Sequence, residues 1–483
     1  MPMRWSLILG LAGTLLALSA PAQATRPETR SRPRPPNLVL ILADDLGYAE
    51  LGCYGQTGIR TPELDRMAQE GIRFTQAYAP SPVCAPTRCS LLTGRHQGHA
   101  FVRDNQEIRR PGSQEFDGQL PLPAGTATLA QRLREAGYRT GIFGKWGLGG
   151  PHTDSVPDRL GFDTFYGYLC QRHAHDHYPA YLWRNRTKEA LAGNPDDSHG
   201  GATYAQDRLF AEARSFVREH RDRPFFLYLP TVVPHLALQV PEDSLAEYRG
   251  RFPDTAYDGK KGYRPHAAPR AAYAAMVTRL DREVGALLAL LRELGLERDT
   301  LVVFTSDNGA TIDIGGADSG FFASTGPYRG RKMSLHEGGL RVPLLARWPG
   351  TIPAGTGSDR ITGLQDLAAT FLDLAGAAPL PAQDGISLAP TLLGRGRQPE
   401  HPWLYFEFRS APGGPQQALR MGQWKALRRI TRDGPAATQL YDLALDPGET
   451  ADRAGSHPEI VARVHAAWAE AHTPSAEFPL RPR

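Results

Sequence analysis

The sequence predicts an α/β protein with a doubly wound, mostly parallel sheet flanked by helices and a smaller C-terminal subdomain built on an antiparallel sheet. Two observations predict the main sheet. Short apolar runs alternate with longer segments of helical periodicity, and polar residues directly follow several of the runs. A third observation predicts the subdomain, because short strand-like runs replace the long helical patterns after about residue 395. In such a fold the active site lies beyond the carboxyl ends of the strands.

The first strand and the first helix are well marked. Residues 38–42 form a continuous apolar run, which is typical of a strand buried on both faces, and Asp44 and Asp45 stand at its carboxyl end. A helix then runs from Thr61 to Gly71, because a hydroxyl cap, a proline and an early acid open it and a glycine closes it.

The alternation of helix and strand continues along the chain. A helix closed by Gly137 leads into a strand that ends at Lys145, and the apolar run beginning at Pro224 leads into a loop that holds His235. The segment 273–294 is the longest predicted helix, since one of its faces carries Met276, Leu280, Val284, Leu287, Leu291 and Leu294. Gly295 ends this helix, and another apolar strand follows it.

The C-terminal part has a different pattern. Its short strand-like runs lie at residues 403–408, 418–429 and 438–446. They predict a small antiparallel sheet, closed by a helix at 458–471. We therefore divide the folded chain into a main domain of residues 37–395 and a subdomain of residues 396–483.

The N-terminus has the features of a secretory signal peptide over residues 1–24. Arg4 precedes the apolar stretch 7–20, and Ala22 to Ala24 form a small-residue cleavage site. Residues 25–36 are rich in proline and arginine and predict a disordered leader. No later stretch approaches the roughly 20 apolar residues of a membrane span. The mature protein is expected to be periplasmic or secreted, without a membrane span.

The bulk composition limits the possible partners. The formal charge of +4 over 483 residues is small for a nucleic-acid binder and suits an anionic small substrate at least as well. Four cysteines in an exported chain would first suggest disulfides. A chain of this length buries enough core to be stable without them.

Polar residues after two buried strands form a candidate metal site. Asp44 and Asp45 follow the first predicted strand. Asp307 and Asn308 follow the predicted strand that comes after Gly295. Each pair alone is usually a helix cap or a turn, but carboxylates without partners at the ends of buried strands are energetically costly. Together the four side chains offer hard oxygen ligands, which favours Ca²⁺ or Mg²⁺ over zinc.

Cys84 lies in the stretch VCAPTRCSLLTGRH, which begins at Val83. Its thiol could be half of a disulfide, a metal ligand, a nucleophile or the precursor of another group. Pro86 and the apolar residues that follow predict that it lies at the N-terminus of a helix, where backbone N–H groups and the helix dipole favour an anion. Arg88, four residues further on, can turn back toward the same point.

The segment around Cys84 resembles the defining motif of the sulfatase family. C-x-P-x-R followed by LLTGR is present here as Cys84 to Arg88 and Leu91 to Arg95. Other motifs of the family occur in family order between about residues 37 and 450, namely ILADDLGY, GIFGKW, VVPH, TSDNG, YRGRKMSLHEGGLRVP and LYDLALDPGET. The resemblance implies an arylsulfatase-like enzyme with the alkaline phosphatase superfamily fold, whose catalytic domain is residues 37–395.

The resemblance also implies a modification of Cys84. In this family a separate enzyme oxidises the motif cysteine to formylglycine, so a formylglycine-generating enzyme or an anaerobic maturase is an implied partner. A simple alkoxide that took sulfate from the substrate would remain a stable ester. Of the two hydroxyls of a hydrated aldehyde, one attacks sulfur and the other expels sulfate as the aldehyde forms again.

The remaining motif residues take their roles from the same resemblance. A divalent cation, Ca²⁺ in the first place and Mg²⁺ as the alternative, is implied at Asp44, Asp45, Cys84, Asp307 and Asn308. Arg88 stabilises residue 84 as an anion. Lys145 and Lys332 bind the sulfate oxygens and neutralise their charge, and His235 contacts the substrate and protonates the leaving alcohol oxygen.

One position departs from the family pattern. Many members carry a histidine after the lysine and tryptophan of the second motif, whereas this chain has Gly147 there. The base for the sulfate-expelling step is therefore open. We predict that His175 replaces the missing imidazole and contacts substrate. His173, His177 and His152 are the other histidines nearby, and water as the base or a purely structural or substrate-facing loop are the alternatives.

The expected function is hydrolysis of a sulfate monoester by an exported sulfatase. The secretory route, the long loops and the aromatic stretch at 178–186 favour a sulfated carbohydrate, of a galactose or N-acetylgalactosamine type, over an aryl sulfate. A phosphate or phosphonate monoester hydrolase of the same fold is one alternative, because two lysines and an arginine would accept either anion. A non-catalytic sulfoglycan-binding protein with an unconverted Cys84 is the other, and Gly147 is the feature that supports it.

Overall fold

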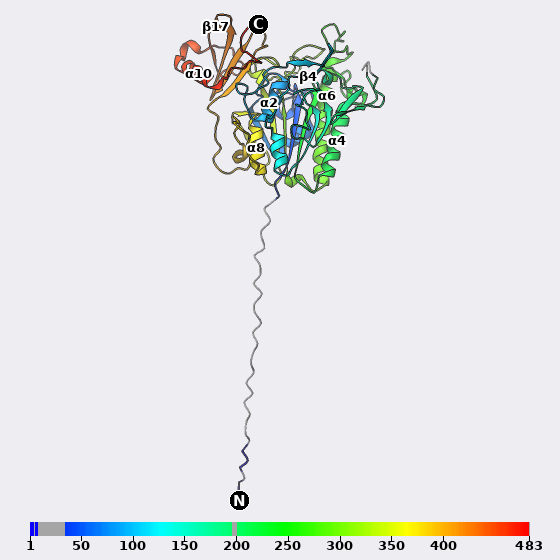
Figure 1. Cartoon of the computed structure of the whole chain (residues 1–483), viewed down its shortest axis with the longest axis vertical. Helices are drawn as coiled ribbons and strands as arrows, with labels where there is room; N and C mark the ends of the chain where they lie inside the picture. Colours follow the sequence, from blue (N-terminus) through cyan, green and yellow to red (C-terminus); the bar gives the residue numbers. More distant parts are fainter. Residues whose placement is uncertain (4, 8–33, 196–199, 483) are drawn as a thin grey trace. The chain divides into compact units, whose positions relative to one another are not determined.

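The computed structural model describes residues 1–3, 5–7, 34–195 and 200–482. Most of the predicted signal peptide and most of the predicted leader, namely residues 4 and 8–33, lie outside the described residues. Backbone contacts divide the chain into two units, Met1–Arg34 and Pro35–Arg483, and every helix and strand given below belongs to the second unit (Figure 1). Within the described residues, no helix is both long enough and apolar enough to cross a membrane.

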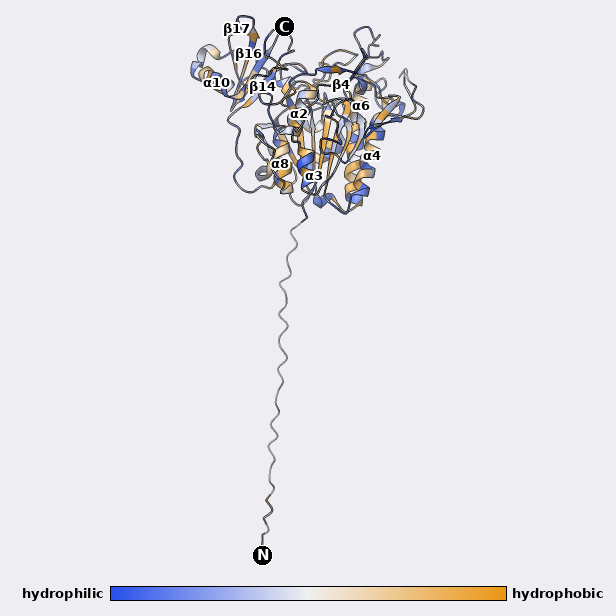
Figure 2. Ribbon diagram, in the orientation of Figure 1, coloured by the Kyte–Doolittle hydropathy of each residue, from blue (hydrophilic) through white to orange (hydrophobic). Residues whose placement is uncertain are grey.

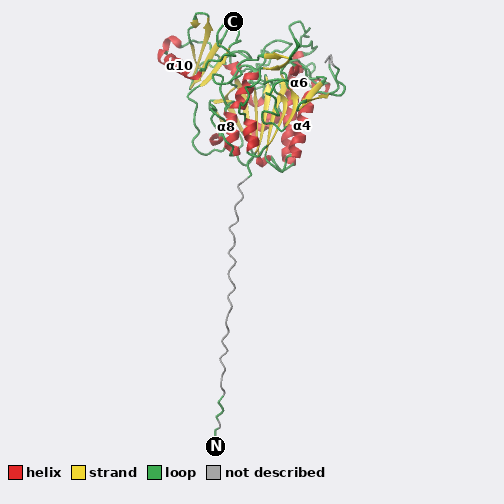
Figure 3. Cartoon of the chain, viewed as in Figure 1, coloured by secondary structure: helices red, strands yellow, loops and turns green. Residues whose placement is uncertain are grey.

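A large sheet forms the centre of the second unit (Figure 3). Five strands at its middle are parallel neighbours in the order β10 (Thr300–Ser306), β1 (Asn37–Asp44), β9 (Phe225–Pro234), β5 (Arg139–Lys145) and β6 (Thr164–Tyr168). Antiparallel pairing extends the sheet beyond β10 through β11 (Arg341–Arg347) and β2 (Ile72–Tyr78), and beyond β6 through β7 (Tyr181–Arg184) and β8 (Thr187–Ala190). Two short strands pair with β2, namely β12 (Thr356–Ser358) and β13 (Thr362–Gly363). The predicted mostly parallel sheet is confirmed.

Helices cover both faces of this sheet, and β1 shows why. Successive side chains of a strand point to opposite faces. Val39 and Ile41 lie in the core shared with α1 (Pro62–Gln69), α4 (Ala205–Glu219) and α6 (Pro269–Glu293). The alternate residues Leu38, Leu40 and Leu42 lie in the core shared with α2 (Cys84–Thr93), α3 (Leu129–Glu135) and α8 (Asp366–Ala375). Burial on both faces explains the unbroken apolar run, and Figure 2 shows hydrophobic residues along the central strands.

A second, antiparallel sheet lies in the C-terminal part, as predicted. Its strands are β14 (Leu404–Phe408), β15 (Gln416–Met421), β16 (Trp424–Thr431), β17 (Gly434–Pro435) and β18 (Gln439–Asp442). The predicted final helix is α10 (Pro458–Ala471), and its Val464 and Trp468 pack against Leu419 and Leu440 of this sheet. The other face of the sheet shares a core with Tyr78 and neighbouring residues of the main part. The boundary at residue 395 stays a prediction, because residues 35–483 form one contact unit.

The remaining elements are short and connect the larger ones. They are the hairpin of β3 (Glu107–Arg109) and β4 (Phe116–Gln119), together with α5 (Glu242–Ala246), α7 (Glu337–Leu340) and α9 (Ala389–Leu392). The longest predicted helix begins earlier than expected, at Pro269 instead of Tyr273, because proline is well suited to the first turn of a helix.

Candidate active site

The carboxyl ends of β1 and β10 bring four polar side chains together. Asp44 ends β1 and Asp45 follows it, while β10 leads directly into Asp307 and Asn308. The Asp307 N–H donates to Ala43 O at 3.0 Å, and the Asp45 N–H donates to Asp307 Oδ1 at 3.2 Å. The Asn308 Nδ2 donates to Asp45 Oδ1 at 2.8 Å. None of the four side chains is more than 1% exposed, so their charges need internal compensation.

Cys84 is the first residue of α2 and lies within this polar cluster, as the sequence predicts. Its Sγ is 3.4 Å from Asp44 Oδ1 and 3.8 Å from Lys332 Nζ. Burial, together with the carboxylates of Asp307 and Asp44, raises the pKa of the Cys84 thiol far above its ordinary value. As a thiol it therefore stays protonated at neutral pH and is a weak nucleophile. All four cysteines fall within the described residues and are free.

Two lysines reach the cluster from different elements. Lys145, the last residue of β5, donates to Asp44 Oδ2 at 2.7 Å, and Lys332 donates to Asp45 Oδ2 at 2.8 Å. Burial alone would lower the pKa of the Lys332 ammonium, but Asp45 and Asp44 raise it well above its ordinary value. Burial alone would raise the pKa of Asp44, but Lys145 and the other cations hold it well below its usual range. The Asp44 carboxylate and the Lys332 ammonium are thus both ionised.

Arg88 supplies the third positive charge from the next turn of α2. Its Nη2 donates to Asp307 Oδ2 at 2.8 Å and lies 3.6 Å from Asp44 Oδ2, while its Nη1 donates to Lys145 O at 2.7 Å. The side chain is 1% exposed. Burial and the Asp44 carboxylate nevertheless raise the pKa of Asp307, because Arg88 does not fully offset two adjacent carboxylates.

His235 approaches the cluster from the loop after β9. Its Nε2 lies 3.6 Å from Asp45 Oδ2, and its Nδ1 lies 2.7 Å from Leu236 O. A carbonyl oxygen only accepts, so Nδ1 carries the proton and Nε2 faces the site. Burial and the charge of Lys332 lower the pKa of His235 well below its ordinary value. A bound anion would favour its protonated form.

Of the histidines considered as replacements for the imidazole missing at Gly147, His175 contacts the ring of a predicted site residue. Its ring stacks on His235 with centroids 4.7 Å apart. Burial, then His235 and Lys145, lower the pKa of His175 to about 2. His177 instead supports the site, since its Nε2 donates to His235 O at 2.9 Å. His173 packs on Tyr168 and Tyr181, and His152 pairs with Asp117.

The donor set fits a hard divalent cation. One ligand atom from each of Asp44, Asp45, Cys84 and His235 lies within 4.8 Å of the others. The buried Asn308 Oδ1 has no hydrogen-bond partner among the residues that the structure describes. This amide oxygen lies beside several carboxylates and accepts no hydrogen bond from the described residues, so it is available as a ligand for a cation that binds oxygen. The cluster can therefore hold a metal.

Comparison with known proteins shows the family to which the chain belongs. The family model described as Sulfatase matches residues 36–377, which is most of the chain. The protein belongs to the sulfatase family. A second model, described as N-sulphoglucosamine sulphohydrolase, C-terminal, matches residues 328–471 of this sulfatase. Membership of the family confirms the expected sulfuric ester hydrolase activity.

Individual relatives agree with the assignment. N-acetylgalactosamine-6-sulfatase of Canis lupus familiaris is 34% identical over 408 residues, which cover 82% of this sulfatase and 72% of the relative. Arylsulfatase A of Homo sapiens is 34% identical over 485 residues, which cover 89% of this sulfatase and 86% of the relative. The solved structure of Ps i-CgsB in complex with k-i-k-neocarrahexaose has a TM-score of 0.74 at 29% identity, and the match covers 91% of this chain and 94% of that one.

The structure of this sulfatase brings every predicted site residue into one cluster, in which only His175 and Lys332 are partly exposed. Its members are Asp44, Asp45, Cys84, Arg88, Lys145, His175, His235, Asp307, Asn308 and Lys332. Their individual roles stay predictions. Sequence reasoning missed Tyr263, whose ring lies 5.4 Å from that of His175. It also missed Gln171, which packs against Gly147. Both residues lie in loops, where no hydrophobic periodicity or motif marks them. The unusual glycine at 147 was the one available signal for Gln171.

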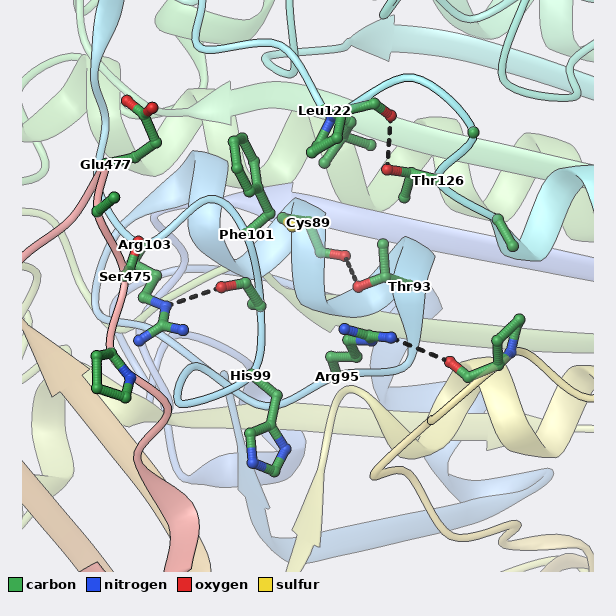
Figure 4. A pocket seen from close by; sticks show the side chains of 17 residues that line it. Cys89, Thr93, Arg95, His99, Phe101, Arg103, Leu122, Thr126, Ser475 and Glu477 are labelled. Atoms are coloured by element: carbon green, nitrogen blue, oxygen red, sulfur yellow. Dashed lines mark hydrogen bonds between the residues drawn. The ribbon is translucent and has the colours of Figure 1, made fainter. Parts of the chain in front are cut away.

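A separate cavity of about 580 Å³ lies at a different part of α2 (Figure 4). Cys89, Thr93, Arg95, Phe101 and Leu122 are among the residues that line it. None of the predicted site residues takes part in its lining, so this cavity is distinct from the active site.

Proposed function

We propose that this protein is an exported sulfatase that removes sulfate from a carbohydrate, with formylglycine formed from Cys84 and a bound Ca²⁺. The observation that carries the proposal is the position of Cys84. It opens a buried helix beside three carboxylates, two lysines and an arginine. Such an arrangement can hold an anion and a cation together, which is what the cleavage of a sulfate ester requires.

Modification of Cys84 supplies the nucleophile. Hydrated formylglycine would provide one hydroxyl for attack on sulfur and a second whose deprotonation expels sulfate. The raised pKa of the Cys84 thiol supports this proposal, because the unmodified side chain stays protonated here. Arg88 can stabilise an anionic oxygen on residue 84, since both lie on the first turns of α2. The oxidation requires a separate maturation enzyme as a partner.

The metal would be held by Asp44, Asp45, Asp307 and Asn308, whose oxygen donors favour Ca²⁺, with Mg²⁺ as the alternative. When bound, the cation would supply positive charge that binds a sulfate oxygen and makes the hydroxyl of residue 84 more acidic. It would also offset the burial and the Asp44 charge that together raise the pKa of Asp307.

The lysines and histidines carry the remaining steps. Lys145 and Lys332 are positioned to bind sulfate oxygens. Each ammonium already donates to a carboxylate oxygen beside Cys84, so it points into the site. His235 can donate a proton from Nε2 to the leaving alcohol oxygen. We assign His175, stacked on His235, as the base of the sulfate-expelling step. Its ring is neutral because its pKa is lowered, and the negative charge of bound sulfate would raise that pKa and make the ring a better proton acceptor.

A galactose- or N-acetylgalactosamine-type sugar is the proposed substrate class. One relative is named an N-acetylgalactosamine-6-sulfatase, and one similar structure is a complex with a neocarrahexaose. The aromatic segment around Tyr181 and Trp183 is near His175 in the chain and suits sugar rings. Residues 1–24 support export through their sequence alone.

The test is a substrate panel with enzyme purified from a host that matures sulfatases. It contains sulfated galactose, N-acetylgalactosamine and glucosamine, their disaccharides, 4-nitrophenyl sulfate and 4-nitrophenyl phosphate. We expect sulfate release from a galactose-type sugar at a kcat/KM well above that for the aryl sulfate, and slower release of phosphate. Turnover of the phosphate ester alone would contradict the proposal.

A further inference from the structure

Gln171 lies beside the strand end that carries Lys145. Gly147, two residues after Lys145, has a φ of +74°, in the left-handed region that favours glycine. A Cβ added to Gly147 would lie 2.6 Å from Gln171 Nε2 and 3.1 Å from Gln171 Cγ. The Gln171 side chain therefore occupies the space over Gly147 that the side chain of any other residue would need.

The backbone holds Gln171 between two parts of the active site. The Gly147 N–H donates to Leu169 O at 3.3 Å, and the Gln171 N–H donates to Gln119 Oε1 at 2.9 Å. The turn that follows Gln171 carries His175, whose ring stacks on His235. The glutamine is thus fixed between the strand that presents Lys145 and the turn that presents His175.

The amide nitrogen of Gln171 has no acceptor among the described residues. The residue is 5% exposed, and its Nε2 has no hydrogen-bond partner in the part of the chain that the structure describes. A primary amide carries two N–H donors, and burying them without an acceptor is unfavourable. Lys145, Lys332 and Arg88 each contact a carboxylate, whereas this amide nitrogen is free to bind an oxygen from outside the chain.

We propose that the Gln171 amide donates a hydrogen bond to an oxygen of the bound sulfate group. Gln171 is then a substrate-binding residue, and Gly147 provides the space in which it lies. The inference rests on the proposed sulfatase function and adds a neutral donor to the charged groups of that site. A neutral amide binds an anionic oxygen at any working pH, since it does not titrate.

The test measures sulfate binding without turnover. Inorganic sulfate is titrated calorimetrically, in the presence of Ca²⁺, into Cys84→Ala protein and into the same protein with a second substitution. Gln171→Met keeps the length of the side chain and removes the donors, so the Kd for sulfate should rise about 10- to 100-fold. Gln171→Glu places a carboxylate near the anion and should weaken binding further. Gln131→Glu on α3 is the matched control, because glutamate also satisfies its capping box.

A second measurement separates binding from a purely structural role. In the enzyme that retains Cys84, Gln171→Met should raise the KM for 4-nitrophenyl sulfate and the inhibition constant for sulfate by similar factors, with the melting temperature unchanged. Equal sulfate affinity with and without Gln171→Met overturns this inference and leaves the sulfatase chemistry intact. If the wild-type enzyme neither binds sulfate nor hydrolyses the ester, the proposed function fails and this inference fails with it.

Discussion

Three carboxylates and three cations meet around Cys84, and each cation contacts at least one carboxylate. The aspartates and Lys145 lie at the ends of buried strands, and Cys84 and Arg88 lie on the buried helix α2, so motif and burial pattern together predicted them. Lys332 lies in a turn, and its motif alone predicted it. His175 was predicted from its chain position to replace the imidazole missing at Gly147. Its ring stacks on His235, while the space over Gly147 itself holds Gln171, so the role of His175 stays a prediction. Gln171 and Tyr263 could not be predicted, because a loop residue acquires its neighbours only through the tertiary fold.

Lys332 should contribute strongly to catalysis. Replacing it by Met removes one of two ammonium groups near the sulfate position, and we expect kcat/KM for 4-nitrophenyl sulfate to fall by about 100-fold or more. Lys260→Met is the control, since its ammonium is exposed and contacts Asp258. A loss smaller than about threefold in folded Lys332→Met protein would contradict this role.

Asp307 should be required for the metal. After treatment with a chelator, Ca²⁺ should raise the melting temperature of the wild type and restore activity. A ligand at about 100 times its Kd stabilises a protein by about 2.7 kcal/mol. Asp307→Ala should lose both responses, and elemental analysis should show less bound metal. Asp258→Ala, which alters an exposed carboxylate, should behave as the wild type. Full metal content in Asp307→Ala would be the contrary result.

At the scale of elements, the parallel neighbours β1 and β10 place the polar residues that follow them side by side at one edge of the sheet. Cys84, the first residue of α2, lies at the same edge. The buried central strands were predictable because both of their faces are apolar. The short strands β7, β8 and β12 were not, since they are partly exposed and carry no regular alternation. The buried strand β13 is only two residues long and carries no pattern. Helix α1 was predicted from its proline and early acids, but its actual cap comes from another helix.

Asp281 of α6 caps α1 across the core. Its carboxylate accepts from Glu63 N–H and Leu64 N–H, whereas the Thr61 side chain makes no capping hydrogen bond. Burial raises the pKa of Asp281 to about 7. Between about pH 4 and pH 7 the folded protein retains a proton that the unfolded chain has released. The free energy of unfolding therefore falls as pH rises through this window, by at most about 1.4 kcal/mol per pH unit for this group.

Asp281→Asn should remove that contribution, because an amide keeps one acceptor and does not titrate. Measured by urea denaturation, the variant should be less stable than the wild type at pH 5 and should recover relative to it at pH 8. A stability difference that is the same at both pH values would show that Asp281 does not titrate in this range.

At the scale of the whole molecule, the C-terminal sheet and the main sheet share a core. Leu404, Phe406 and Leu427 of the smaller sheet pack with Tyr78 and Leu340 of the main part. A buried ion pair crosses the same boundary, since Lys425 of β16 donates to Glu337 Oε1 at 2.8 Å and both side chains are fully buried. Glu337 also accepts from the Tyr78 hydroxyl at 2.8 Å. The sequence predicted the two sheets, but it could not show that a buried ion pair joins them.

Lys425→Met should destabilise the protein by about 3–5 kcal/mol, because it leaves the Glu337 carboxylate buried without its ammonium partner. Burial opposes ionisation of Glu337, but Lys425 and Arg341 lower its pKa to about 2, so the group is charged at neutral pH. The double variant Glu337→Gln with Lys425→Met should regain part of the loss. Urea denaturation measures both, and a loss below about 1 kcal/mol in Lys425→Met would contradict a structural role for the pair.

The chemical state of residue 84 is the decisive property of this enzyme. Mass spectrometry of the proteolytic peptide that contains it, on preparations of different specific activity, gives the fraction of aldehyde directly. We predict that activity rises in proportion to that fraction and that Cys84→Ala protein is folded but inactive. Full activity in a preparation whose residue 84 is entirely an unmodified thiol would contradict the proposed chemistry.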